Sequence, residues 1–82
     1  MSYREVSALR KAGQLEEATV MAREDIARYR DKWSCRALFW CLHEVAKNAE
    51  SESLVLLAEE MRNLLENMGE DSVAIECIQR IE

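Results

Sequence analysis

The chain has 82 residues, of which 49% are hydrophobic and 33% are charged, with no Pro and two Gly. This length allows one small domain, and the hydrophobic share excludes the composition typical of disordered chains. Because the chain is rich in Ala, Leu, Glu, Arg and Met, helix is favoured over strand nearly throughout. We therefore expect residues 1–82 to form a single all-α domain of about five helices.

The net charge of −5 is distributed unevenly along the chain. Residues 1–43 hold eight Lys or Arg against six Asp or Glu, whereas residues 44–82 hold three against ten. The two halves therefore carry about +2 and about −7. Such a dipolar domain can steer a charged partner or pair with a copy of itself.

The sequence gives an expectation about the cellular compartment. No N-terminal apolar run resembles a signal peptide, and no stretch reaches the ~18 apolar residues that a membrane span needs. An odd number of cysteines without regular spacing is typical of reduced thiols. We expect a cytoplasmic protein in which Cys35, Cys41 and Cys77 pack as small hydrophobic side chains.

Two helices are predicted in the first third of the chain. Ser2 and Glu5 have the spacing of a capping box, and Gly13 is expected to end the first helix in a left-handed turn. In the second helix Asp25 lies close to the predicted buried stripe. The apolar positions with helical spacing are Leu15, Ala18, Ala22, Ile26 and Tyr29. The connection between the two helices, at Gly13, is short. It therefore predicts that the two helices are antiparallel neighbours.

The third predicted helix contains the most hydrophobic stretch, residues 37–42 (ALFWCL), and Asp31 is its expected N-cap. A segment that is apolar on every side has no face for water, so it must lie between other elements or at an interface. We expect this helix to be central and to dominate stability, so that Trp40→Ala would cost ~3–5 kcal/mol if the indole is fully buried.

Two further helices complete the predicted fold. A polar turn is expected at residues 48–53, with Ser51 or Ser53 as the cap. The helix that follows has the clearest amphipathic stripe, formed by Leu54, Leu57, Ala58, Met61, Leu64, Leu65 and Met68. Gly69 ends it, and Asp71 or Ser72 caps a fifth helix. That helix is expected to pack Val73, Cys77 and Ile78 inward and to expose an apolar edge at Ile75 and Ile81.

Residues 9–18 (LRKAGQLEEA) resemble the turn between the two helices of a tetratricopeptide repeat. In that family a Gly ends the first helix, a large apolar residue opens the second, and an Ala five residues after the Gly allows close helix packing. Gly13, Leu15 and Ala18 match these positions, and the next hairpin follows with a period near 34 residues. The sequence departs from the pattern at Arg30, where a Pro is usual, and at Lys47, where the second turn would have its Gly.

The resemblance implies a right-handed superhelical stack of antiparallel helical hairpins. Its concave side, lined by the first helix of each pair, would bind peptides or protein segments. Some family members clamp a terminal carboxylate with Lys and Asn, but the matching sites here carry Tyr3, Ser7, Ala37 and Cys41. Recognition of a chaperone tail is therefore not expected.

No residue set in the chain indicates a reaction. His43 is the sole histidine, and no Gly-rich elbow surrounds a Ser. Cys35, Cys41 and His43 point to different sides of one helix, so they do not converge on a metal ion. We expect no enzyme activity, no cofactor and no metal site.

The predicted function is a non-catalytic protein-interaction module that binds a peptide or protein partner, alone or as a segment of a longer polypeptide. The candidate partner-binding residues are Tyr3, Arg10, Arg36, Trp40, His43, Ile75 and Ile81. One alternative is a homodimeric helical domain. Another is a nucleic-acid-contacting domain, less favoured in an acidic chain, that would use the basic cluster formed by Arg23, Arg28, Arg30, Lys32 and Arg36.

Overall fold

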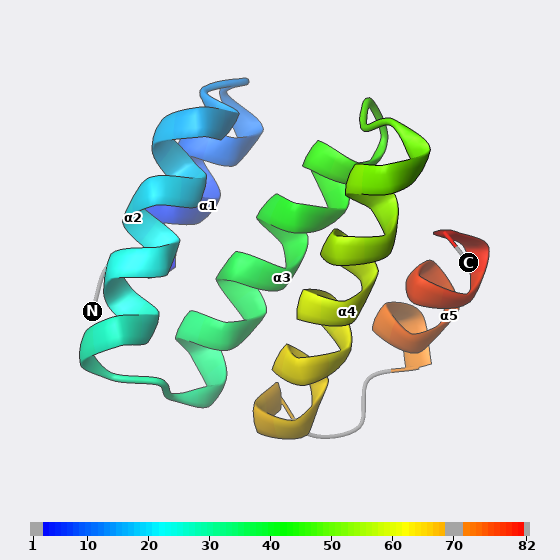
Figure 1. Ribbon diagram of the computed structural model, residues 1–82. Coiled ribbons are helices and arrows are strands. Elements are labelled where there is room, and N and C mark those ends of the chain that lie inside the picture. The colour runs from blue at the N-terminus through cyan, green and yellow to red at the C-terminus, as the bar shows by residue number, and fades with distance from the viewer. Residues whose placement is uncertain (1–2, 69–71, 82) are drawn as a thin grey trace.

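The computed structural model describes residues 3–68 and 72–81, and every regular element in these two ranges is an α-helix (Figure 1). The helices are α1 (Tyr3–Lys11), α2 (Leu15–Arg28), α3 (Lys32–Ala46), α4 (Ser51–Met68) and α5 (Ser72–Ile81). The prediction of an all-α fold with five helices is confirmed. None of these helices is both long enough and apolar enough to cross a membrane.

The helices form a row with α3 at its centre (Figure 1). Helix α3 packs against both α2 and α4, α1 packs on α2 and α3, and α5 packs on α4. In Figure 1, α1 lies behind α2, and the first hairpin and α5 lie at opposite ends of the row. Helices α1 and α3 are therefore neighbours, although α2 separates them in the sequence.

The turn between α1 and α2 has the conformation expected at Gly13, whose φ is +85°. The amide of Gln14 donates to the carbonyl of Leu9 at 2.9 Å, and the amide of Gly13 donates to the carbonyl of Arg10 at 3.2 Å. These two bonds make a Schellman motif, which satisfies carbonyls that the helix end would otherwise leave free. The motif reverses the chain within three residues and places α2 against α1.

The turn between α2 and α3 is equally short. The amide of Tyr29 donates to the carbonyl of Asp25 at 2.8 Å, and Arg30 adopts a φ of +36°. Asp31 caps α3 as predicted, because its Oδ2 accepts from the amide of Trp33 at 3.3 Å. The predicted proximity of Asp25 to the buried stripe is also confirmed, since Asp25 is buried.

The core lies where α1, α2 and α4 meet α3. Small side chains on α2 let this helix pack closely against its neighbours, and larger side chains on α3 and α4 fill the centre of the core. The fully buried apolar residues are Val6, Ala18, Ala22, Cys35, Phe39, Cys41 and Met61. The prediction that Cys35 and Cys41 pack as hydrophobic side chains is confirmed, and burial raises the pKa of both thiols.

The Trp40 indole packs against the core but is not fully buried. Trp40 is partly exposed, and its neighbour Phe39 is the fully buried aromatic residue of α3. Trp33, seven residues earlier on the same side, is also about half exposed. Helix α1 has nine residues and covers this side of α3 only in part, whereas α2 and α4 enclose the other sides.

The prediction that Tyr29 joins the buried stripe of α2 is wrong, since Tyr29 lies in the exposed turn after α2.

Helix α4 begins earlier than predicted. The amide of Leu54 donates to the carbonyl of Glu50 at 2.9 Å, so residues 51–53 belong to the helix and Ser51 and Ser53 are not its cap. Glu52 in the first turn is favoured by the positive end of the helix. The predicted stripe is confirmed by the burial of Ala58, Met61 and Leu64.

The structure describes only some of the residues for which predictions were made around α5. Ile78 is buried, Cys77 is partly buried and Ile75 is exposed, as predicted. The predicted caps and end residues Ser2, Gly69 and Asp71 lie outside the described residues, and so do the side chains of Val73 and Ile81.

Candidate functional site

A hollow of about 260 Å³ lies between α1 and α3, and we call the surface around it the α1–α3 face. It is lined by Tyr3, Ser7, Arg10, Trp33, Arg36, Ala37 and Trp40. On each helix these positions recur at intervals of three or four residues, which places them on one side. Two neighbouring helices thus each contribute one stripe of side chains to the same surface.

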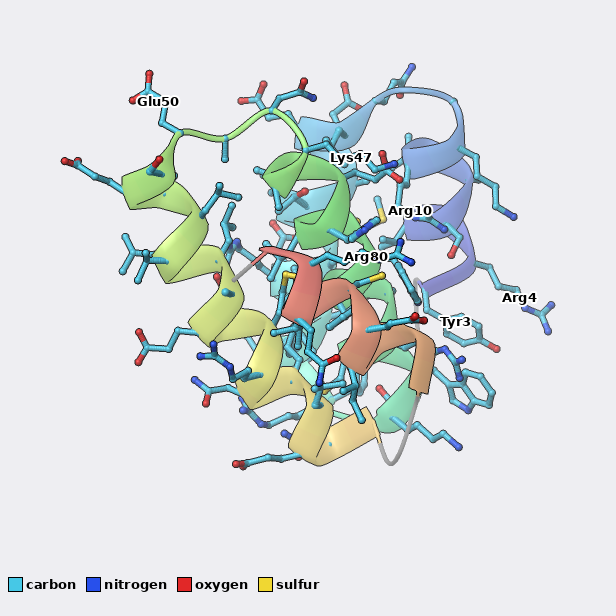
Figure 2. All side chains as sticks on the ribbon, turned by 90° about the vertical axis from the view of Figure 1, so that its right-hand side faces the viewer. Tyr3, Arg4, Arg10, Lys47, Glu50 and Arg80 are labelled. Atoms are coloured by element: carbon cyan, nitrogen blue, oxygen red, sulfur yellow. The ribbon has the colours of Figure 1, made fainter. Side chains whose placement is uncertain are left out.

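An aromatic stack closes one end of this hollow. The rings of Tyr3 and Trp33 lie 5.9 Å apart at an interplanar angle of 24°, so the start of α1 is joined to the start of α3. Arg4 lies 5.9 Å from the centre of the Tyr3 ring, and the Lys32 ammonium lies 5.5 Å from the centre of the Trp33 ring. Figure 2 shows Tyr3 and Arg4 projecting outward from α1. This end is therefore an aromatic rim flanked by cations.

Trp40 lines the other end of the hollow. Its ring meets the ring of the fully buried Phe39 edge-on at 5.1 Å and the ring of His43 edge-on at 5.5 Å. These two contacts fix the orientation of the indole. Part of the indole stays accessible, because the side of α3 that carries it is only partly covered.

The surroundings of His43 favour the neutral form of its imidazole. Burial holds the pKa of the imidazole below its usual range, and the nearby cations Lys47 and Arg10 lower it further, while Glu44 opposes them. Lys47 and Glu44 form an ion pair of 3.3 Å beside it. The Nδ1 atom of His43 is buried and has no hydrogen-bond partner within the described part of the chain. His43 therefore supports Trp40 as a neutral ring and adds no charge to the face.

The α1–α3 face is basic although the whole chain is acidic. Arg10 and Arg36 line the hollow, Arg4 and Lys32 flank its aromatic rim, and no acidic side chain is among the residues that line it. The face combines cations with accessible aromatic surface, a pairing that suits an acidic segment carrying an apolar or aromatic side chain.

The structure brings five of the seven predicted site residues together. Tyr3, Arg10, Arg36 and Trp40 line the hollow, and His43 contacts Trp40. Ile75 does not belong to this site, because it lies on α5 beside a separate hollow of about 230 Å³. The side chain of Ile81 lies outside the described residues.

Sequence reasoning missed Ser7, Trp33 and Ala37 as residues of this site. All three line the hollow, and Trp33 also stacks on Tyr3. The available signal was its spacing, since Trp33 stands seven residues before Trp40 and three before Arg36, two predicted site residues.

The basic cluster predicted at residues 23–36 does not form one surface. Arg23 pairs with Glu60 through both carboxylate oxygens, with Nη2 to Oε2 at 3.3 Å, and this pair joins α2 to α4. Arg36 instead lines the α1–α3 hollow. The two ends of the cluster are therefore engaged on different sides of the molecule.

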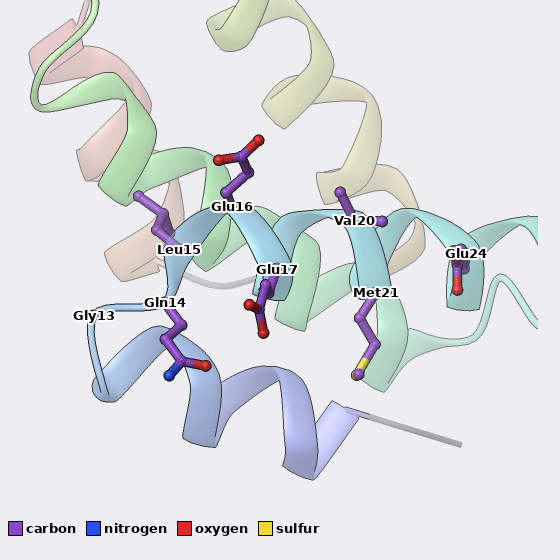
Figure 3. A pocket seen from close by; sticks show the side chains of 8 residues that line it. All are labelled: Gly13, Gln14, Leu15, Glu16, Glu17, Val20, Met21 and Glu24. Carbon is purple, nitrogen blue, oxygen red and sulfur yellow. The ribbon is translucent and has the colours of Figure 1, made fainter.

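A hollow of about 680 Å³ follows α2 and contains none of the predicted site residues (Figure 3). It is lined by Gly13, Gln14, Leu15, Glu16, Glu17, Val20, Met21 and Glu24. Its three carboxylates make this surface acidic, in contrast to the α1–α3 face.

Comparison of the chain with protein-family models, with curated proteins and with solved structures gave no match.

Proposed function

We propose that the chain is a non-catalytic protein-interaction module that binds an acidic peptide or protein segment on the α1–α3 face. The observation that carries this proposal is the convergence of Tyr3, Arg10, Arg36 and Trp40 around one hollow. These residues come from two helices separated by α2. An aromatic residue or Arg at such a surface typically contributes much of the binding energy of a partner.

The proposal includes a tetratricopeptide-like arrangement of the hairpins. It is supported by the left-handed Gly13 at the first turn and by the fully buried Ala18 at the close contact of α2. It is also supported by the packing of α1 against α3, since these are the first helices of successive hairpins. In such an arrangement the first helices line the surface that receives the partner.

A cytoplasmic location is part of the proposal. Cys35, Cys41 and Cys77 are free thiols, and the first two are buried in the core. Buried free thiols in a small domain are compatible with a reducing compartment.

A pair of charge reversals tests the proposed binding face. Peptides would first be selected for binding from a random library and then measured against variants by fluorescence anisotropy. Arg10→Glu is expected to weaken binding by about tenfold or more, because it places a carboxylate beside the hollow. Lys11→Glu makes the same change of charge one residue away, at an exposed position that does not line the hollow, and should alter affinity by less than about twofold.

The comparison separates a local contact from a general effect of charge. If both variants weaken binding equally, the peptide responds to the net charge of the chain and not to the hollow. If Arg10→Glu leaves the affinity unchanged, the partner binds elsewhere and the proposal is wrong.

A further inference from the structure

Another hollow, of about 650 Å³, lies between α2 and α4 at the end where both helices begin. We call it the α2–α4 groove. It is lined by Leu15, Val45, Asn48, Ala49, Glu50, Ser53, Leu56 and Leu57. Leu15 comes from α2, Leu56 and Leu57 come from α4, and Val45 comes from the end of α3 that lies between them. Three helices thus contribute apolar side chains to one surface.

The Arg23–Glu60 ion pair shows which sides of α2 and α4 face each other. Glu16 and Val20 lie seven and three residues before Arg23, on the same side of α2, and Figure 3 shows both projecting in the same direction. On α4, Leu56 lies four residues before Glu60 and shares its side. Val20 and Leu56 therefore lie on the sides of α2 and α4 that face each other, in two adjoining hollows that share Leu15.

The apolar side chains of this groove are unusually accessible. Leu56, which lines the groove, is 68% exposed, and Val20, which lines the adjoining hollow along α2, is 54% exposed. Leu15 and Leu57 are partly buried against the core and extend the apolar surface inward. Exposed apolar surface that is continuous and bordered by polar residues marks interaction sites more often than isolated exposed leucines do.

Two carboxylates border this apolar surface. Glu50 lines the groove, and Glu16, which lines the adjoining hollow along α2, projects from the side of α2 that carries Arg23. Arg23 at the far end is already paired with Glu60. A partner that enters the groove therefore meets apolar contacts at the centre and negative charge at the rim.

We propose that the α2–α4 groove binds a basic amphipathic helix of a partner protein. Its apolar side chains would contact Leu15 and Leu56, and its Lys or Arg side chains would lie toward Glu16 and Glu50, in the manner of a helix in a groove. A second copy of this chain, whose net charge is −5, could meet the acidic rim only with its basic α1–α3 face, and it is a separate outcome of the test below. This inference does not depend on the function proposed for the α1–α3 face.

The probe for this proposal is a fluorescent peptide with Leu at positions i, i+3, i+4 and i+7 of a helix and Lys at the remaining positions. Its control has the same composition, with the Leu residues distributed around the helix. We expect the full chain to bind the amphipathic peptide about tenfold more tightly than the control in an anisotropy titration. Equal affinities would mean that charge alone drives binding, and the proposal would be overturned.

Two matched variants locate the binding surface. Leu56 and Val55 are both 68% exposed, but only Leu56 lines the groove. Leu56→Gln is expected to weaken binding of the amphipathic peptide by about tenfold, and Val55→Gln by less than about twofold. Neither change removes a buried side chain, so both variants should keep the helical circular dichroism of the parent.

Three further results would overturn the proposal. The first is binding that survives Leu56→Gln, and the second is an equal loss in both variants. The third is a self-associated chain, seen by sedimentation without any peptide, that Leu56→Gln converts to monomer. That third result would assign the groove to a second copy of the chain.

Discussion

Replacing Phe39 with Ala is expected to lower the free energy of unfolding by ~3–5 kcal/mol. Phe39 is fully buried on α3, where α2 and α4 pack on either side, so its removal leaves a cavity at the centre of the fold. Native domains have a total stability of ~5–15 kcal/mol, so the variant should lose a large share of it. Urea unfolding followed by circular dichroism measures the change.

Trp40→Ala is the control for this prediction. Trp40 is adjacent to Phe39 and has a larger side chain, but it is partly exposed and lines the α1–α3 hollow. We expect a smaller loss of stability than for Phe39→Ala, because less apolar surface leaves the core. A larger loss for Trp40→Ala would show that Trp40 and not Phe39 occupies the centre of the core.

Replacing Gly13 with Val is expected to lower the free energy of unfolding by more than ~1 kcal/mol. The φ of Gly13 is +85°, and a Cβ added there would meet no atom within 4 Å. The cost therefore comes from the backbone conformation and not from a clash with neighbouring side chains. A β-branched residue is especially unfavourable in this region. The denaturant midpoint of the variant gives the measurement.

Gly13→Asn is the matched comparison at the same position. Asn tolerates a left-handed backbone better than Val does, so its loss of stability should be clearly smaller. If Val and Asn cost the same, or if Val leaves the midpoint unchanged, then the Schellman turn does not require Gly13.

The helices and their turns could be predicted because their causes are local. The capping role of Asp31 and the left-handed Gly13 follow from a few neighbouring residues, and both are present in the structure. The stripe of Ala58, Met61 and Leu64 follows from the period of a helix. The central position of α3 could be predicted from residues 37–42, because a stretch that is apolar on every side needs neighbours on more than one side.

The details of the faces could not be predicted because they depend on contacts between distant residues. The period of a helix predicts that Trp33 and Trp40 share a side of α3. It does not predict that the short helix α1 covers this side only in part. The same limit applies to Leu56, which is exposed within an apolar helix. The pairing of Arg23 with Glu60 joins residues 37 positions apart, and it divides a basic cluster that is continuous in the sequence.

Amide NMR of the isotope-labelled chain tests the proposed binding face most directly. Titration with an acidic peptide selected from the library should shift the signals of Ser7, Ala37 and the Trp40 indole, which surround the α1–α3 hollow. The signals of Val55 and Glu59, exposed on α4, should stay in place. The largest shifts along α4, with the Trp40 indole unchanged, would contradict the assignment of the α1–α3 face as the partner-binding surface.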